Sequence, residues 1–300
     1  PDGYALRADL SRHHGVEISE IVLSNGSNEL IDLIFRTFAM PGAHAVYPDP
    51  SFVCYRIGAT SSNMAASEVT LRGNLAYDVD ALLAAVRPET TLLFVANPNN
   101  PTGAHIARTE LTRLLREVPP HVIVVLDEAY VEFADAPDFV SALELRGLRE
   151  HLIVLRTFSK AYGLAGFRVG YGVASPKIVN YIDRVRAPFN VSSIGIAAAR
   201  AALTDRAHLE RGLTLNRSER ARVTAALSAL GLAVAPSQTN FVLVDMQRDG
   251  RGVYDRLLRK GVIVRPMPPP IASWLRITIG QVHENDRMLG AMRELMEARS

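Results

Sequence analysis

The sequence contains little of what marks disulfide-rich, membrane-bound or nucleic-acid-binding proteins. Its single cysteine, Cys54, excludes an internal disulfide framework and fits a reducing compartment, so a cytoplasmic location is expected. No apolar stretch approaches the length of a membrane span, so no membrane partner is expected. The 33 Lys and Arg residues nearly balance the 31 Asp and Glu residues and are scattered along the chain, which gives little support to nucleic-acid binding.

The overall composition is that of an ordinary soluble globular protein. Hydrophobic residues make up 48% of the 300 residues and charged residues 21%, so the chain can bury a sizeable core in one large domain or two smaller ones. It has no internal repeat and no low-complexity tract.

Short apolar runs alternate with helix-like stretches through the first two-thirds of the sequence. The run from Val122 to Leu126 has the length and unbroken apolar character of a strand buried on both faces, and helical spacing precedes it from Arg108 to Val118. This alternation predicts an α/β fold with a mainly parallel, doubly wound sheet. The other strands expected in this sheet are Ile21 to Leu23, Ala45 to Tyr47, Thr91 to Ala96, Leu152 to Leu155 and Val169 to Val173.

A different pattern begins after Ser193 and predicts a second, α+β unit. It consists of long helices at Ile194 to Leu203 and Leu209 to Leu230, then strands at Leu232 to Ala235, Phe241 to Asp245 and Val262 to Arg265. We therefore expect a large domain at residues 15–205 and a small C-terminal domain at residues 206–300. Residues 1–14 are expected to pack on the small domain.

The most informative segment runs from Leu155 to Arg168, Leu-Arg-Thr-Phe-Ser-Lys-Ala-Tyr-Gly-Leu-Ala-Gly-Phe-Arg. Its strand-like approach and glycine-punctuated exit place Lys160 in a loop at a strand end, where active-site groups of α/β proteins collect. Ser159 supplies a hydroxyl and Arg168 a forked cation, and both suit a phosphate. A solvated lysine is the ordinary alternative for any single lysine. An amine that can bond an aldehyde beside a phosphate site is what pyridoxal phosphate requires.

The sequence Asp127-Glu-Ala-Tyr130 directly follows a predicted strand. A carboxylate at the end of a buried strand is costly unless a partner meets it. Taken alone, Asp127 could cap the next helix and Tyr130 could fill the core. Beside a lysine-bound pyridoxal phosphate, Asp127 can hold the pyridine nitrogen protonated, and Tyr130 can donate a hydrogen bond to the phenolic oxygen of the ring.

Two other turns that follow predicted strands contain side chains suited to the same cofactor. The segment Asn97 to Gly103 could be only a turn, but Asn100 can present its amide to the ring oxygen as a second donor. Phe52 can stack on a pyridine ring, although core packing is the ordinary role of a phenylalanine.

A phosphate can also bind where the turn from Ser24 to Asn28 enters a helix. Free backbone N–H groups and the helix dipole attract anions there, which makes Ser27 and Asn28 candidates, although small polar residues precede most helices. All these turns are predicted on one edge of the sheet, so they predict a single site. None of the candidates is a metal ligand, and no metal is expected.

Three motifs, in order, resemble those of fold-type I pyridoxal-phosphate aminotransferases and, within them, of the histidinol-phosphate aminotransferase family. They are Asn-Asn-Pro-Thr-Gly, Asp-Glu-Ala-Tyr and Ser-Lys-Ala-Tyr-Gly-Leu-Ala-Gly-Phe-Arg. The likeness runs from the opening residues to about Asn285. It implies that Lys160 carries the cofactor and that Asp127 pairs with the ring nitrogen. It also implies that Tyr130 and Asn100 hold the ring oxygen.

The same resemblance assigns the remaining candidates. Ser159, Arg168 and the backbone of Ser27 and Asn28 would bind the phosphate. Phe52 would cover the ring where many relatives have tyrosine, which keeps stacking but loses a hydroxyl.

Two arginines in the C-terminal part are candidates for substrate binding. The segment from Trp274 to Gly280 resembles the family segment whose arginine grips the substrate carboxylate, which assigns Arg276, and a guanidinium suits a planar carboxylate. Arg265, at the end of the preceding strand, is a candidate for another anionic group of the substrate, although a lone arginine on a strand commonly faces solvent.

The resemblance implies ping-pong transamination between L-histidinol phosphate and 2-oxoglutarate or glutamate, in a homodimer. Aromatic amino acids such as phenylalanine are an alternative, because the motifs do not separate the two substrate classes. A pyridoxal-phosphate decarboxylase, such as threonine-phosphate decarboxylase, shares the fold and cofactor. A non-catalytic ligand-binding module would be expected to bring a DNA-binding region, and none is visible in the sequence. The N-terminal arm of the family is expected to be absent before Pro1.

Overall fold

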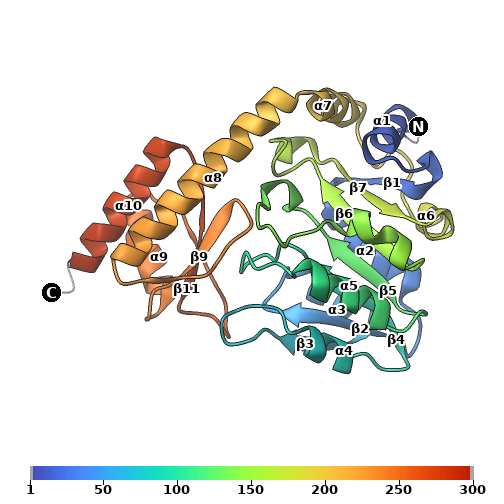
Figure 1. Cartoon of the computed structure of the whole chain (residues 1–300), viewed down its shortest axis with the longest axis horizontal. Coiled ribbons are helices and arrows are strands. Elements are labelled where there is room, and N and C mark those ends of the chain that lie inside the picture. The colour runs from blue at the N-terminus through green and yellow to red at the C-terminus, as the bar shows by residue number, and fades with distance from the viewer. Residues whose placement is uncertain (1–2, 298–300) are drawn as a thin grey trace.

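A seven-stranded sheet forms the centre of the larger of two units in the computed structural model, which describes residues 3–297 (Figure 1). The strand order is β1-β7-β6-β5-β4-β2-β3. Strands β2 to β6 pair in parallel, whereas β7 runs antiparallel to β6 and β1. The predicted α/β class with a mainly parallel sheet is confirmed. The strands are β1 Ile21–Ser24, β2 His44–Asp49, β3 Ala65–Thr70, β4 Thr90–Ala96, β5 Ile123–Asp127, β6 Leu152–Thr157 and β7 Gly170–Ala174.

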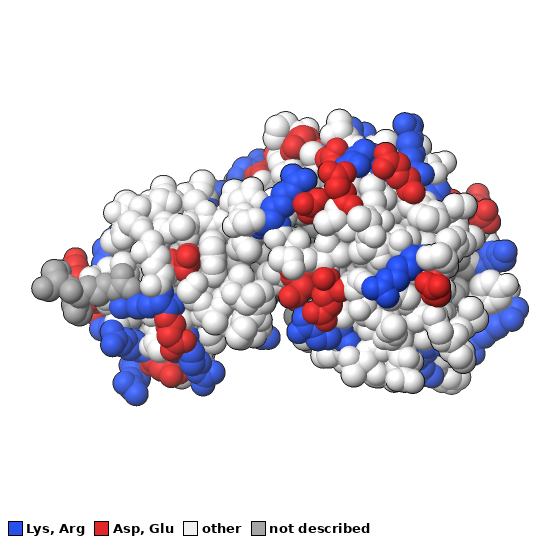
Figure 2. Space-filling model, turned by 90° about the horizontal axis from the view of Figure 1, so that it is seen from below, with Lys and Arg blue, Asp and Glu red and all other residues white. Residues whose placement is uncertain are grey.

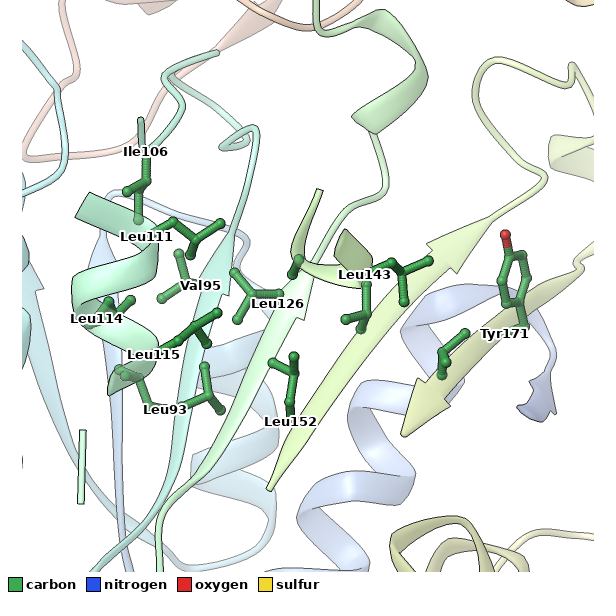
Figure 3. Packing of buried hydrophobic residues seen from close by; sticks show 14 of the residues in the cluster. Leu93, Val95, Ile106, Leu111, Leu114, Leu115, Leu126, Leu143, Leu152 and Tyr171 are labelled. Carbon is green, nitrogen blue, oxygen red and sulfur yellow. The ribbon is translucent and has the colours of Figure 1, made fainter. Parts of the chain in front are cut away.

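Helices cover both faces of this sheet, because successive residues of its central strands alternate between two hydrophobic layers. Leu93 of β4 lies in one layer and Phe94 in the other. Figure 3 shows the first layer, which also contains Leu111 and Leu114 of α5. Each fully buried leucine contributes about 1.5–3 kcal/mol to folding. The first layer contains α1 Tyr4–His14, α4 Val79–Ala84, α5 Arg108–Glu117 and α7 Ser193–Thr204; the second contains α2 Gly26–Phe38, α3 Cys54–Ser61 and α6 Pro176–Asp183.

The parallel strands β2, β4, β5 and β6 end at one edge of the sheet. In the register of the sheet, Ala96 lies beside Asp127, and Asp127 lies beside Leu155. Because the carboxyl ends of parallel strands meet at one edge, the loops that follow them are neighbours. The loops that contain the predicted site residues are thus brought together.

The smaller unit has its own antiparallel sheet, of order β10-β11-β9-β8, and its own hydrophobic core. Figure 1 shows this unit beside the larger one, with the long helix α8 running from α7 across it. On the face shown in Figure 2, acidic and basic side chains are interspersed over both units. The elements are α8 Arg206–Ala229, β8 Ala233–Val234, β9 Phe241–Asp245, α9 Gly250–Arg259, β10 Arg265–Pro266, β11 Trp274–Thr278 and α10 Val282–Glu297. Short 3₁₀ helices lie at η1 Ile18–Glu20, η2 Val131–Phe133, η3 Ala142–Leu148 and η4 Ala165–Phe167.

Helix α1 packs on the larger unit, contrary to the prediction for residues 1–14. Leu6 and Leu10 lie one turn apart on one helix face, and both are fully buried in the layer that contains α5 and α7. Figure 1 shows α1 beside α7, away from the C-terminal helices. The described part of this segment, residues 3–14, therefore belongs with the larger sheet. The domain boundary between residues 205 and 206 stays a prediction.

Within residues 3–297, no helix is long and apolar enough to cross a membrane. The same residues include no group of three or more His, Cys, Asp and Glu side chains that could hold a metal ion.

Candidate active site

Two adjoining cavities lie at the carboxyl edge of the larger sheet. The first, here called the lysine cavity, is lined by every residue predicted to bind the cofactor: Ser27, Asn28, Phe52, Asn100, Asp127, Tyr130, Ser159, Lys160 and Arg168. The second, here called the arginine cavity, has a volume of about 310 Å³ and is lined by both predicted substrate residues, Arg265 and Arg276. Lys160 and Tyr130 line both cavities. The structure thus brings all the predicted site residues together.

Lys160 follows β6 in a loop at the junction of the two cavities. Its Nζ atom lies 5.3 Å from the ring centroid of Tyr130. Desolvation lowers the pKa of Lys160, and the cations Arg276 and Arg168 lower it further, whereas Asp127 raises it. A lowered pKa favours the neutral amine, which is the form that attacks a carbonyl carbon. The surroundings of Lys160 therefore suit a nucleophile and a proton carrier.

Asp127 is the last residue of β5 and is buried. The hydroxyl of Tyr55 donates to its Oδ2 atom at 3.0 Å, and the backbone N–H of Ala129 donates to its Oδ1 atom at 3.2 Å. Burial raises the pKa of Asp127 to about 6, although these hydrogen bonds and nearby Lys160 lower it. A buried carboxylate held in this way is stabilised by a cationic N–H group placed opposite it.

Ser27, Asn28, Ser159 and Arg168 form a cradle for an anion. Ser27 and Asn28 are in the first turn of α2, a helix of 13 residues, where backbone N–H groups are free of intrahelical partners. Arg168 adopts a left-handed backbone conformation with φ 56°, and its Nη1 atom donates to Ser159 Oγ at 3.3 Å.

Two glycines allow this cradle to form. A Cβ atom added to Gly26 would lie 2.3 Å from Arg168 Nη2. A Cβ atom added to Gly170 of β7 would lie 2.4 Å from the backbone nitrogen of Ser27. A side chain at position 170 would have to displace this backbone, and Gly26 has a φ of 72°, which L side chains rarely adopt, so both positions favour glycine. The glycines thus help to place a guanidinium against a helix N-terminus. This donor set fits a phosphate group.

Arg276 reaches the site from β11 of the smaller sheet. Its guanidinium lies over the ring of Phe241, 4.9 Å from the centroid, and its Nη1 atom donates to Asn100 Oδ1. Its Nε atom is buried without a hydrogen-bond partner among the described residues. Desolvation lowers the pKa of Arg276, and neighbouring Arg265 lowers it further, whereas Tyr130 raises it. Arg265 lies directly across the β10–β11 pair from Arg276, so two cations are presented to one cavity.

Three contributors were not predicted as site residues. Tyr55 hydrogen-bonds Asp127, Phe241 packs against both Arg276 and Tyr130, and Asp49 lines the arginine cavity. Asp49 follows a predicted strand, as Asp127 does, and that position was its one signal in the sequence. The contacts of Tyr55 and Phe241 join residues far apart in the chain, and nothing in the local pattern indicates them.

These features together are typical of one enzyme class: doubly wound α/β proteins with a lysine, a buried carboxylate and an anion cradle at the carboxyl edge of the sheet. Comparison with known proteins is consistent with that class. The family model for aminotransferase class I and II matches residues 3–292, and the chain belongs to this family.

Several relatives share most of their length with this chain. A histidinol-phosphate aminotransferase of Anaeromyxobacter sp. (strain Fw109-5) is 46% identical, over 99% of this chain and 83% of the relative. Histidinol-phosphate aminotransferase 2 of Pseudomonas fluorescens (strain Pf-5) is 42% identical, over 98% of this chain and 80% of the relative. These matches confirm the resemblance inferred from the motifs.

Solved structures agree with the fold. The histidinol-phosphate aminotransferase of Sinorhizobium meliloti, determined in complex with pyridoxal-5'-phosphate, has a TM-score of 0.94 and 32% identity, covering all of this chain and 83% of that one. The L-threonine-O-3-phosphate decarboxylase of Porphyromonas gingivalis has a TM-score of 0.85 and 25% identity, covering 99% of this chain and 90% of that one. The predicted fold-type I architecture is confirmed.

Proposed function

We propose that this protein is a pyridoxal-phosphate-dependent aminotransferase that moves an amino group between L-histidinol phosphate and 2-oxoglutarate or glutamate. The observation that carries the proposal is the joint placement of Lys160, buried Asp127 and the anion cradle in the lysine cavity. The relatives named histidinol-phosphate aminotransferase support the choice of substrate.

Each residue of the lysine cavity has a place in this proposal. Pyridoxal phosphate supplies an electron-withdrawing ring that takes up the charge left when a proton leaves the substrate Cα. Lys160 Nζ would bond the cofactor at rest and, once released, would carry the proton between the substrate Cα and the C4′ carbon of the cofactor. The carboxylate of Asp127 keeps a proton on the ring nitrogen. The phosphate binds Arg168, Ser159 and the backbone of Ser27 and Asn28.

The remaining cofactor contacts concern the ring. The Tyr130 hydroxyl and the amide NH₂ of Asn100 donate toward the phenolic oxygen. The orientation of Asn100 supports this role, because its Oδ1 atom accepts from Arg276 and the amide nitrogen is left to donate elsewhere. Phe52 covers the ring by stacking.

Arg276 and Arg265 bind the anionic groups of the substrates in this proposal. Arg276 meets the α-carboxylate of glutamate, and Arg265 meets a second anionic group. The buried, unpartnered Nε atom of Arg276 supports a role in anion binding, since such a donor is costly to leave without an acceptor.

We also infer a cytoplasmic homodimer. Large apolar side chains exposed on the larger unit support a dimer, because Phe189 is 72% exposed, Ile194 69% and Tyr4 62%. The single cysteine fits a reducing compartment. Sedimentation analysis of the cofactor-loaded protein tests the oligomeric state, and a monomer at micromolar concentration would contradict it.

Steady-state kinetics test the substrate assignment. The expected result is a higher kcat/KM for L-histidinol phosphate than for L-phenylalanine, with 2-oxoglutarate as acceptor. A preference for phenylalanine would indicate an aromatic aminotransferase. Release of carbon dioxide from an amino-acid phosphate without transfer to 2-oxoglutarate would indicate a decarboxylase.

A further inference from the structure

Charge is unevenly distributed in the arginine cavity. Its lining includes the cations Lys160, Arg265, Arg276 and Arg56, but a single carboxylate, that of Asp49. Asp49 is the last residue of β2, and its side chain is 27% exposed. A carboxylate in the same cavity as Arg265 and Arg276, the two arginines proposed to bind anions, indicates that the ligand also presents an N–H donor.

The carboxylate of Asp49 is held in position by Arg56. Arg56 Nη2 donates to Asp49 Oδ1 at 3.1 Å, and Arg56 is itself fixed by Glu68, which accepts from Nε and Nη2 at 2.6 Å each. The turn after Asp49 is tied down as well, since Asn99 Nδ2 donates to the carbonyl of Pro50 at 3.1 Å. Asp49 is thus a preorganised acceptor.

This acceptor is not saturated by the protein. Glu68 neutralises Arg56 through a bidentate pair, so Arg56 is shared between two carboxylates. Within residues 3–297, Oδ2 of Asp49 accepts no hydrogen bond. Burial raises the pKa of Asp49 above its ordinary range, Arg56 lowers it, and Glu68 raises it, so the carboxylate gains from a further donor.

The position of Asp49 along the sheet edge suits the side chain of a substrate. The strand order β5-β4-β2 places Asp49 two strands away from Asp127, which is roughly 10 Å at the usual strand spacing. Asp49 and Lys160 also line the same cavity, so a substrate whose reacting carbon lies near Lys160 can direct a side-chain ring toward Asp49.

L-Histidinol phosphate has three groups to be recognised: an amine, a phosphate and an imidazole ring. In the proposed function, on which this step rests, the amine reacts near Lys160 and the phosphate meets arginine. We infer that Asp49 is a specificity-determining residue whose carboxylate accepts a hydrogen bond from the imidazole N–H of the substrate. A phenyl ring offers no such donor and would desolvate the carboxylate without compensation.

Equilibrium binding to the cofactor-loaded enzyme tests this inference apart from turnover. Two probes lack the reactive amine and differ in the ring alone: 3-(imidazol-4-yl)propyl phosphate and 3-phenylpropyl phosphate. Calorimetry should show that the wild type binds the imidazole probe about tenfold to a hundredfold more tightly, as expected for a hydrogen bond to a charged group. In Asp49→Ala this preference should fall at least about tenfold.

The control is Asp32→Ala, which removes an exposed carboxylate of α2 that makes one ion pair with Arg36 at 3.8 Å. It should keep the wild-type preference. If Asp49→Ala does not fold, Asp49→Leu removes the acceptor while filling its space. Equal affinity of the wild type for the two probes, or an unchanged preference in a folded Asp49 variant, would overturn the inference.

Kinetics separate this inference from the proposed function. A wild-type enzyme that does not transaminate L-histidinol phosphate refutes the proposed function and removes the basis of the Asp49 assignment. The other outcome concerns Asp49 alone. In that outcome the wild type transaminates L-histidinol phosphate, while Asp49→Ala keeps the wild-type ratio of kcat/KM for L-histidinol phosphate to kcat/KM for L-phenylalanine. That result refutes the Asp49 assignment and leaves the proposed function standing.

Discussion

At the scale of residues, the site depends on two opposite charges whose surroundings disfavour both ionised forms. Desolvation lowers the pKa of Lys160 and raises that of Asp127 to about 6. Each shift prepares the group for a ligand: the amine for an aldehyde carbon and the carboxylate for a protonated ring nitrogen. We therefore expect buried Asp127 to reduce the stability of the free protein, and the cofactor to relieve that cost.

Replacing Lys160 separates chemistry from folding. Lys160→Ala removes both the covalent anchor and the proton carrier, so turnover should fall by about 10²- to 10⁴-fold or more. The melting temperature of the cofactor-free protein should change little, because the lysine side chain is exposed to the cavity. Lys177→Ala on α6 is the matched control, and it should keep full activity. A Lys160→Ala protein with more than one tenth of wild-type kcat would contradict the assignment.

Replacing Asp127 should reveal how much its burial lowers the free energy of unfolding. Its pKa rises from the ordinary 3.8 to about 6 on folding, so the neutral form is favoured in the folded state. The contribution of neutral Asp127 to the free energy of unfolding is fully present below about pH 4, and it is lost as the pH rises through about 6. In the cofactor-free protein at pH 7, Asp127→Asn should therefore raise the free energy of unfolding by about 1–3 kcal/mol while abolishing turnover.

Denaturant unfolding of the cofactor-free wild type and Asp127→Asn between pH 4 and pH 7.5 checks this prediction. The difference between the two proteins should be small near pH 4 and grow toward pH 7. If Asp127→Asn is less stable than the wild type at pH 7, the ionised Asp127 carboxylate is already stabilised by the cofactor-free protein, and the prediction is wrong.

At the scale of elements, most strands of the larger sheet were predicted from the sequence, but the side-chain contacts between segments far apart in the chain were not. The unbroken apolar runs of β4, β5 and β6 identify strands buried on both faces, and the predicted bounds differ from the observed ones by one or two residues. Strand β3 has mostly exposed or half-buried residues and lacked such a run. Strand β10 begins at Arg265, although the apolar pattern predicted a strand from Val262.

Site residues were predictable where one local segment contains the chemistry, as around Lys160. Tyr55 and Phe241 were not predictable, because their roles arise from contacts across the fold. Tyr55 meets Asp127 72 positions later in the chain, and Phe241 meets Tyr130 from the other unit.

The close approach of β7 to α2 gives a prediction for an element junction. Gly170→Ala would place a Cβ atom 2.4 Å from the backbone of Ser27, so the N-terminus of α2 must shift. Overpacking of this kind should lower the free energy of unfolding by about 1–3 kcal/mol. Because the cradle is displaced, the affinity for pyridoxal phosphate should also fall about tenfold. Fluorescence titration and thermal unfolding measure the two effects.

Gly290→Ala in α10 is the matched control, because an added Cβ atom there meets nothing within 4 Å. It should stabilise the helix by about 1 kcal/mol and leave cofactor affinity unchanged. Equal cofactor affinity in Gly170→Ala and the wild type would show that the contact between β7 and the N-terminus of α2 does not determine the geometry of the anion cradle.

At the scale of the whole molecule, the site is assembled from both units. The larger sheet supplies Lys160 and Asp127, and the smaller sheet supplies Arg276, whose contact with Asn100 crosses between them. The units are joined elsewhere too, since Arg220 of α8 pairs with Asp135 at 2.7 Å. If Arg276 binds substrate as proposed, binding would couple the smaller unit to the chemistry on the larger one.

Removal of this bridge should affect substrate binding more than chemistry. In Arg276→Ala the KM for glutamate should rise about tenfold to a hundredfold, as expected for losing charged hydrogen bonds, with a smaller change in kcat. Arg259→Ala, an exposed arginine of α9, is the control. An unchanged KM for glutamate in Arg276→Ala would remove its role in anion binding.

The central claim is that Lys160 bonds the aldehyde of pyridoxal phosphate. Borohydride reduction of the cofactor-loaded protein, followed by peptide mapping, tests it most directly. The predicted result is a stable adduct on the Ser159–Lys160 peptide, with the other lysines, Lys177 and Lys260, unmodified. An adduct confined to Lys177 or Lys260, or no adduct on any lysine, would contradict the account.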